Sequence, residues 1–138
     1  MDDVFGTVLT IIKNDTAVAA IVSTRVSSEV QTVPCVQLID NAASRYPFGP
    51  GSGRMRYQHW QGVARCWSAD TPTGAIQARQ LAGAVSDAIH NMRPVTTGGK
   101  HIRVGYTPEI DGLERDPITH RPFYDVVINV KAATNAAA

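Results

Sequence analysis

The sequence has few of the residues and spacings that build a metal site. Its 138 residues include two cysteines and four histidines. None of them stands in the CxxC or HxxxH spacing that typically holds zinc. Asp111, Glu114 and Asp116 lack the alternating ligands and closing glutamate of a calcium loop. We therefore expect no metal ion.

The two cysteines, Cys35 and Cys66, each lie in an apolar run. Buried free thiols are favoured at such positions, with a disulfide as the alternative. Cys66 and His59 form the only pair that resembles a nucleophile and its base. Seven residues apart on one strand, however, the two side chains would point to opposite faces.

A strong excess of charge is also missing. Thirteen basic and twelve acidic residues give a formal net charge of +1, which excludes a strong overall attraction to nucleic acid or to an anionic membrane. No apolar run approaches the roughly 20 residues of a membrane span. The Met-Asp-Asp start lacks the basic and apolar segments of a signal peptide. We expect synthesis in a reducing cytosol and no membrane partner.

Neither glycine-rich segment of the sequence matches the pattern of a phosphate-binding loop. Gly98-Gly99-Lys100 lacks both the spaced first glycine and the hydroxyl residue of a P-loop. The glycines of residues 49–53 are interrupted by Pro50, which has no free amide to offer a phosphate. We therefore expect no cofactor and no catalytic residues, and we interpret the chain as something other than an enzyme.

One long amphipathic helix, expected over residues 70–92, organises the chain. Asp70 or Thr71 could cap its start, and Pro72 suits its first turn. Roughly twenty residues make a rod of about 30 Å. Gly83 inside the helix indicates a position where a side chain does not fit. The apolar stripe recurs at steps of three and four residues and consists of Ala78, Leu81, Ala82, Val85, Ile89 and Met92.

The remaining pattern predicts two short N-terminal helices, at about 3–13 and 15–22, followed by strands. The expected strands are 26–30, 33–40, 57–69, 101–107 and 123–131. In the strand at 57–69, Gly62, Ala64 and Cys66 would face the helix, and Val63, Arg65 and Trp67 would lie on the other face. This order predicts a single α+β domain over 1–138. Its antiparallel sheet of four to five strands would carry the helices on one face.

Two long loops are expected, at 41–56 and 108–122, with a frayed tail from about residue 132. Loops of this length are uncommon unless they are functional or disordered. We expect both to be mobile in the free subunit and to make assembly contacts. The candidate contact residues in the loops and on the helix-free strand face are Arg45, Tyr46, Phe48, Arg54, Arg56, Arg65, Trp67, Asp111, Glu114 and Arg115.

The order of these segments resembles the tail-completion and tail-terminator proteins of long-tailed bacteriophages. The resemblance covers most of the chain and is one of residue type and order. The segments that carry it are the opening helix Val4 to Lys13, the run Asp15 to Val22 followed by Arg25-Val26, Val33 to Leu38, Val63 to Ala69 leading into the helix Thr71 to Met92, and Phe123 to Val130.

The resemblance implies a structural virion protein without an active site. Members of that family close the end of the tail tube, usually as a hexameric ring, and join the tail to the head. The implied partners are further copies of the chain, the tail tube protein, the head–tail connector and DNA in the ring lumen. The implied location is the tail or neck of the virion, after assembly in the host bacterial cytoplasm.

Three alternatives remain open from the sequence. The first is another neck or head-completion component. The second is a small hydrolase or transferase whose site would lie near Cys66, His59 and the acidic loop. The third is a nucleic-acid-binding module that uses Arg45, Arg54 and Arg56, since basic side chains among aromatic ones can contact phosphates and bases.

Overall fold

The computed structural model describes residues 4–40, 55–97 and 100–135. The elements follow one another as α1 (Val4–Asn14), α2 (Thr16–Val22), β1 (Val26–Ser27), β2 (Cys35–Asp40), β3 (Met55–Trp67), α3 (Gly74–His90), β4 (Val95–Thr97), β5 (Lys100–Ile110), β6 (Glu114–Arg115) and β7 (Pro122–Asn135).

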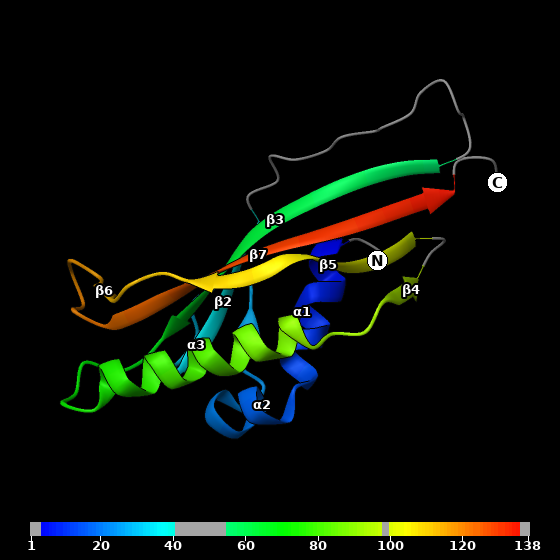
Figure 1. Cartoon of the computed structure of the whole chain (residues 1–138). Helices are drawn as coiled ribbons and strands as arrows, with labels where there is room; N and C mark the ends of the chain where they lie inside the picture. Colours follow the sequence, from blue (N-terminus) through cyan, green and yellow to red (C-terminus); the bar gives the residue numbers. More distant parts are fainter. Residues whose placement is uncertain (1–3, 41–54, 98–99, 136–138) are drawn as a thin grey trace.

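The strands form one curled sheet with the helices on one side (Figure 1). The strand order is β1-β2-β3-β7-β5-β4, and β6 pairs with β7. β1 runs parallel to β2, whereas the other pairs are antiparallel. The α+β class is therefore confirmed, but the expected purely antiparallel sheet of four to five strands is wrong. The described residues form a seven-stranded mixed sheet.

The sheet is larger than expected because its central strands are longer. β7 continues to Asn135, where it pairs with Met55 of β3, so the described residues after 132 are not a frayed tail. The last two residues of the expected loop 41–56 belong to β3, and residues 41–54 lie outside the described residues. The expected loop 108–122 instead contains the end of β5, all of β6 and the start of β7.

The helices differ from expectation mainly at their ends. Asp15 caps α2, and its carboxylate accepts a hydrogen bond from the amide of Val18 at 3.1 Å. α3 begins at Gly74, later than the expected residue 70, and Thr73 at its cap position makes no side-chain hydrogen bond. Asp70, Thr71 and Pro72 therefore precede the helix rather than opening it. At the start of α3, Ser68 donates to Gln77 at 2.6 Å and joins the end of β3 to the helix.

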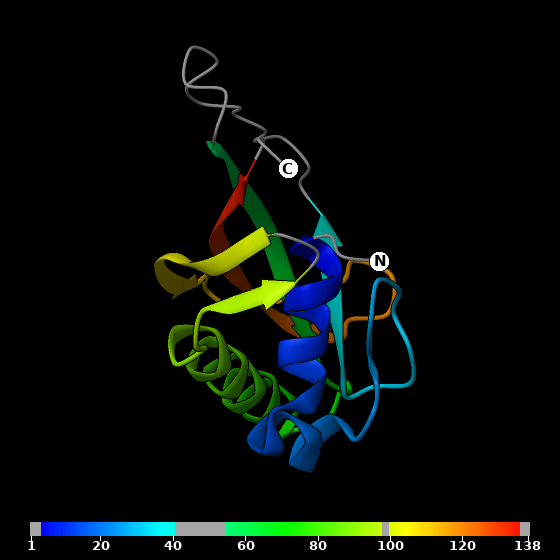
Figure 2. The same ribbon diagram turned by 90° about the vertical axis from the view of Figure 1, so that its right-hand side faces the viewer.

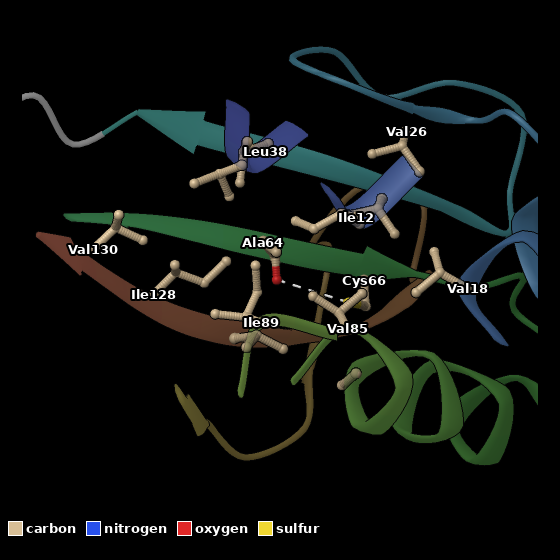
Figure 3. Close-up of a cluster of buried hydrophobic side chains, with 14 of the residues drawn as sticks. Ile12, Val18, Val26, Leu38, Ala64, Cys66, Val85, Ile89, Ile128 and Val130 are labelled. Atoms are coloured by element: carbon tan, nitrogen blue, oxygen red, sulfur yellow. Dashed lines mark hydrogen bonds between the residues drawn. The ribbon is translucent and has the colours of Figure 1, made fainter. Parts of the chain in front are cut away.

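The core lies between the helices and one face of the sheet (Figure 3). The small side chains of Ala64 and Cys66 on β3 lie beneath α3, whose Ala82 and Val85 are fully buried, as the sequence predicted. α1 and α2 pack beside α3 on the same face and add further aliphatic side chains to this core, so that both short helices are stabilised by docking. The buried aliphatic residues of these two helices are Val4, Val8, Ile12, Val18 and Val22.

Two glycines differ in how much space surrounds them: Gly62 is tightly packed, and Gly83 is open. A Cβ atom added at Gly62 would overlap the indole ring of Trp60. Trp60 in turn donates to Asp40 at 3.0 Å and lies edge-on to Phe5. At Gly83 in α3, a Cβ atom would meet nothing within 4 Å. The expectation that a side chain does not fit at Gly83 is therefore wrong for this subunit.

We predict that Gly83→Ala raises the free energy of unfolding by about 0.5–1 kcal/mol, because alanine restricts the unfolded chain and favours the helix. Urea unfolding followed by circular dichroism measures this. Gly62→Ala is the matched control and should lower the free energy of unfolding by about 1–3 kcal/mol through overpacking. A destabilised Gly83→Ala variant would contradict the open position seen here.

Candidate assembly surface

The face of the sheet opposite the helices is the first candidate surface. Because side chains alternate along a strand, the register of β2, β3 and β7 places a second row of residues on this face. Among the described residues, no helix covers it (Figures 1 and 2). This helix-free face carries Cys35, Gln37 and Ile39 from β2, His59, Gln61, Val63, Arg65 and Trp67 from β3, and Phe123, Asp125, Val127, Asn129 and Lys131 from β7.

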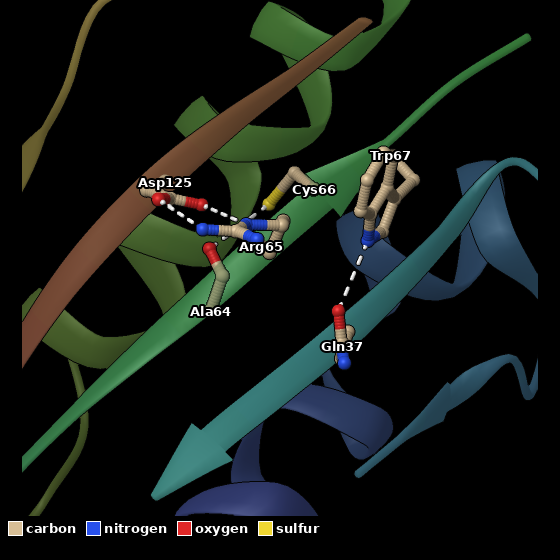
Figure 4. A network of polar contacts seen from close by, with 6 residues as sticks. All are labelled: Gln37, Ala64, Arg65, Cys66, Trp67 and Asp125. Carbon is tan, nitrogen blue, oxygen red and sulfur yellow. Dashed lines mark hydrogen bonds and ion pairs between the residues drawn. The ribbon is translucent and has the colours of Figure 1, made fainter. Parts of the chain in front are cut away.

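Arg65 and Asp125 form an ion pair on this face (Figure 4). Arg65 donates from Nε to Asp125 Oδ1 at 2.8 Å and from Nη2 to Oδ2 at 3.1 Å. The two residues are direct cross-strand partners, so the sheet register supplies the geometry. The hydrogen bond to Asp125 raises the pKa of Arg65 against the opposing effect of burial, and the charges of Asp125 and Glu114 add to the rise.

The guanidinium of Arg65 also lies over two aromatic rings. Its carbon is 4.3 Å from the ring centre of Phe123 and 5.9 Å from that of Trp67. The two rings contact each other with centroids 4.6 Å apart, and Trp67 donates to Gln37 at 3.2 Å. With Cys35 and Val33 the rings form a small second hydrophobic cluster. Two of the predicted contact residues, Arg65 and Trp67, therefore belong to one ordered platform.

We predict that Asp125→Asn lowers the free energy of unfolding by about 1–2 kcal/mol, because a charged, bidentate and largely buried partner of Arg65 is lost. The exposed fraction of the side chain is 31% for Arg65 and 16% for Asp125. Asp70→Asn is the matched control, since Asp70 pairs with Arg115 at 3.5 Å and both side chains are about half exposed. Its effect should stay below about 0.5 kcal/mol. Equal effects in urea unfolding would contradict this account.

The second candidate surface is the protruding segment of residues 110–121, here called the hairpin. β6 pairs with β7 through Glu114↔Phe123 and Arg115↔Pro122. Arg115 donates to the carbonyl of His120 at 3.2 Å, within the same segment. Three predicted contact residues, Asp111, Glu114 and Arg115, lie here and are exposed.

The tip of the hairpin is fixed by the carboxylate of Asp116. It accepts hydrogen bonds from the amides of Ile118 and Thr119 at 2.8 and 2.9 Å. Backbone bonds from Asp116 to Arg121 and from His120 to Asp116 close the turn. His120 adopts a positive φ of 59° at this turn. These bonds hold Ile118 outward, with 86% of its surface exposed.

The amide hydrogen bonds from Thr119 and Ile118 lower the pKa of Asp116. A carboxyl group with a lowered pKa stabilises the turn above its ordinary pKa, and that contribution is lost as the pH falls through the lowered value. We therefore predict that the protection factors of the Ile118 and Thr119 amides, which compare exchange with the intrinsic rate at the same pH, are high at neutral pH and fall in acid. Amide exchange by NMR measures this, with Asp116→Ala as the variant that should lose protection at every pH. Protection independent of both pH and Asp116 would contradict the assignment.

The sequence did not identify the exposed aliphatic residues of this segment. Ile110 and Leu113 are 44% and 43% exposed and precede Ile118. The sequence predicts assembly contacts in residues 108–122 through charged residues alone. The isoleucine and leucine between its acids were the signal that could have added apolar residues to that contact surface.

The other predicted contact residues come from the expected loop 41–56. Arg45, Tyr46, Phe48 and Arg54 lie outside the described residues. Arg56 lies in β3, opposite Thr134 of β7, rather than in a loop.

The structure does not favour Cys66 as a nucleophile with His59 as its base. Cys35 and Cys66 are free and buried, as expected. Burial raises the pKa of the Cys66 thiol well above its usual range, and the charge of Asp125 adds to the rise. This environment does not favour the thiolate that a nucleophile requires. His59, on the other face of β3, contacts Asn129 at 3.1 Å.

Within residues 4–40, 55–97 and 100–135, no group of three or more potential metal ligands comes together. In the same ranges, no single helix is long and apolar enough to span a membrane. α1 and α2 satisfy that test only as a pair bent by 77°.

The comparisons with known proteins show a similarity of fold. The sequence matches no family model, and a search of curated proteins finds no similar sequence. Among solved structures, a chain from "Virion of native gene transfer agent (GTA) particle" has a similar fold, with a TM-score of 0.63 and 21% sequence identity. The similarity covers 91% of this chain and 91% of that one. At this identity it establishes a shared fold.

Proposed function

We propose that this chain is a structural protein of a phage-like virion. The observation that carries the proposal is the similarity of fold to a chain of a gene transfer agent virion over 91% of both chains. A match of that extent spans nearly the whole of both chains, rather than one shared motif. Localisation in the virion and contact with other virion proteins follow from the same proposal.

Within that class, we propose that the chain caps the tail tube and joins the tail to the head connector as a ring-forming homo-oligomer. The order of its elements supports this, through the resemblance to tail-terminator proteins. Two distinct surfaces support it as well, because a subunit of a heterologous ring uses a different patch toward each neighbour. The helix-free face and the hairpin are such patches. A hexamer is the expected ring, with tube protein and connector on its two sides and DNA in its lumen.

This proposal includes no catalytic step and no cofactor, and it places assembly in the host bacterial cytoplasm. Another neck or head-completion component is the second candidate, because it would use the same two-sided self-association. A hydrolase at Cys66 has less support, since that thiol is buried beneath α3 and its raised pKa keeps it protonated.

We predict that cells producing particles without this chain accumulate filled heads and unjoined tails, because the joining surface is missing. Electron microscopy of lysates measures the fraction of joined particles, and expression of the intact chain should restore joining. Normal tails with empty or unfilled heads would instead indicate a head-completion role. Normal infectious particles would contradict the virion proposal.

A further inference from the structure

The outer face of α3 is centred on a glycine. α3 lies at the outside of the helical layer (Figure 2) and buries one stripe against the sheet. At about 100° per residue, every exposed residue of the helix lies within about 60° of Gly83 around the helix axis. Gly83 therefore marks the middle of the exposed face. The exposed residues of α3 are Ile76, Arg79, Gln80, Asp87 and His90.

Nothing in the described part of the chain explains a glycine at this position. A Cβ atom at Gly83 would meet nothing within 4 Å, and glycine is less favourable in a helix interior than any residue except proline. What a glycine permits is a close contact, because helix axes can approach to about 8 Å where the side chains between them are small. Gly83 is therefore suited to a second helix that crosses the middle of this face.

The charges on this face are arranged symmetrically about Gly83. Arg79 precedes Gly83 by four residues, and Asp87 follows it by four. They therefore lie about 6 Å before and after Gly83 along the axis, and about 40° to either side of it. Neither side chain forms an ion pair with a described residue. Both charges are available to a partner.

A second copy of α3 complements this arrangement. If the two helices cross antiparallel with their Gly83 residues facing, Arg79 of each copy comes opposite Asp87 of the other. One two-fold axis then generates both ion pairs, as an isologous contact requires. The same axis brings Ile76, which is 61% exposed, against His90 of the other copy. A parallel arrangement would instead place like charges opposite each other, which is unfavourable.

We propose that two copies of this chain pair through α3, antiparallel about a two-fold axis at Gly83. The contact goes beyond the proposed function, because neither the helix-free face nor the hairpin takes part in it. An isologous contact is closed, so it joins two chains and does not build a ring by itself. One helix from each copy makes a small interface, and we expect a weak association that depends on protein concentration.

Exchanging the two charges tests the pairing directly. Arg79→Asp sets an aspartate against Asp87 of the other copy, and Asp87→Arg sets an arginine against Arg79. Each variant alone should self-associate with a dissociation constant about tenfold or more above that of the unmodified chain. A mixture of the two variants should restore the association, because each copy then meets opposite charges. Analytical ultracentrifugation with one variant labelled measures this.

Lys13→Asp is the control for the change in net charge. Lys13 is exposed in the last turn of α1, outside the face centred on Gly83. This variant should shift the dissociation constant less than about twofold. Association through any ring contact is common to all of these measurements and cancels in the comparison.

Gly83→Gln tests the close approach of the two helices separately. Glutamine is a good helix former and the position is open, so the subunit should unfold at no lower urea concentration than the unmodified chain. The added side chain should hold the helix axes apart and raise the dissociation constant about tenfold. Circular dichroism follows the unfolding, and ultracentrifugation follows the association.

Three results would overturn the pairing. They are a mixture of charge variants that associates no better than either variant alone, a Gly83→Gln variant that associates as well as the unmodified chain, and an unmodified chain that stays monomeric at its highest soluble concentration. The virion role is tested by particles from cells that lack the chain. It does not depend on this contact, so either proposal can fail without the other.

Discussion

The structure depends on the pairing of β3 with β7, which runs without a break from Met55↔Asn135 to Trp67↔Phe123. This register places Ala64 and Ile128 beneath the helices and places the ion pair of Arg65 and Asp125 on the opposite face. A shift of one residue would expose the core row and bury the charged row. The hydrophobic core and the helix-free face are therefore two consequences of one constraint.

Much of this arrangement was predictable because it depends on local patterns. The alternation in β3 assigned the correct residues to its two faces, and the apolar stripe identified α3. The ends of elements were less predictable. The parallel pairing of β1 with β2, the short strands β4 and β6 and the continuation of β7 past Ala132 depend on partners distant in the sequence. Alanine and asparagine have low strand propensity, and here the pairing with β3 outweighs it.

The candidate surfaces were predictable only in part, for a related reason. Arg65 and Trp67 stood out because an arginine between large apolar residues on a strand is unusual. The contacts of Arg65 and Trp67 with Phe123, and the ion pair of Arg65 with Asp125, depend on the sheet register. A local sequence pattern does not contain that register. The role of Asp116 in fixing the hairpin, and hence the exposure of Ile118, depends on backbone geometry. A molecule with an ordered platform on one face and a rigid apolar tip at one end is suited to self-association.

The central claim is that this chain acts by repeated association of unlike surfaces in a virion. A cryo-electron microscopy reconstruction of the particle that contains it tests this most directly. The account predicts a closed ring of copies between the tail tube and the head, with each hairpin packed on the neighbouring subunit and the helix-free face in contact with virion protein. An isolated copy, or a ring in which the hairpin and the helix-free face both remain in solvent, would contradict it.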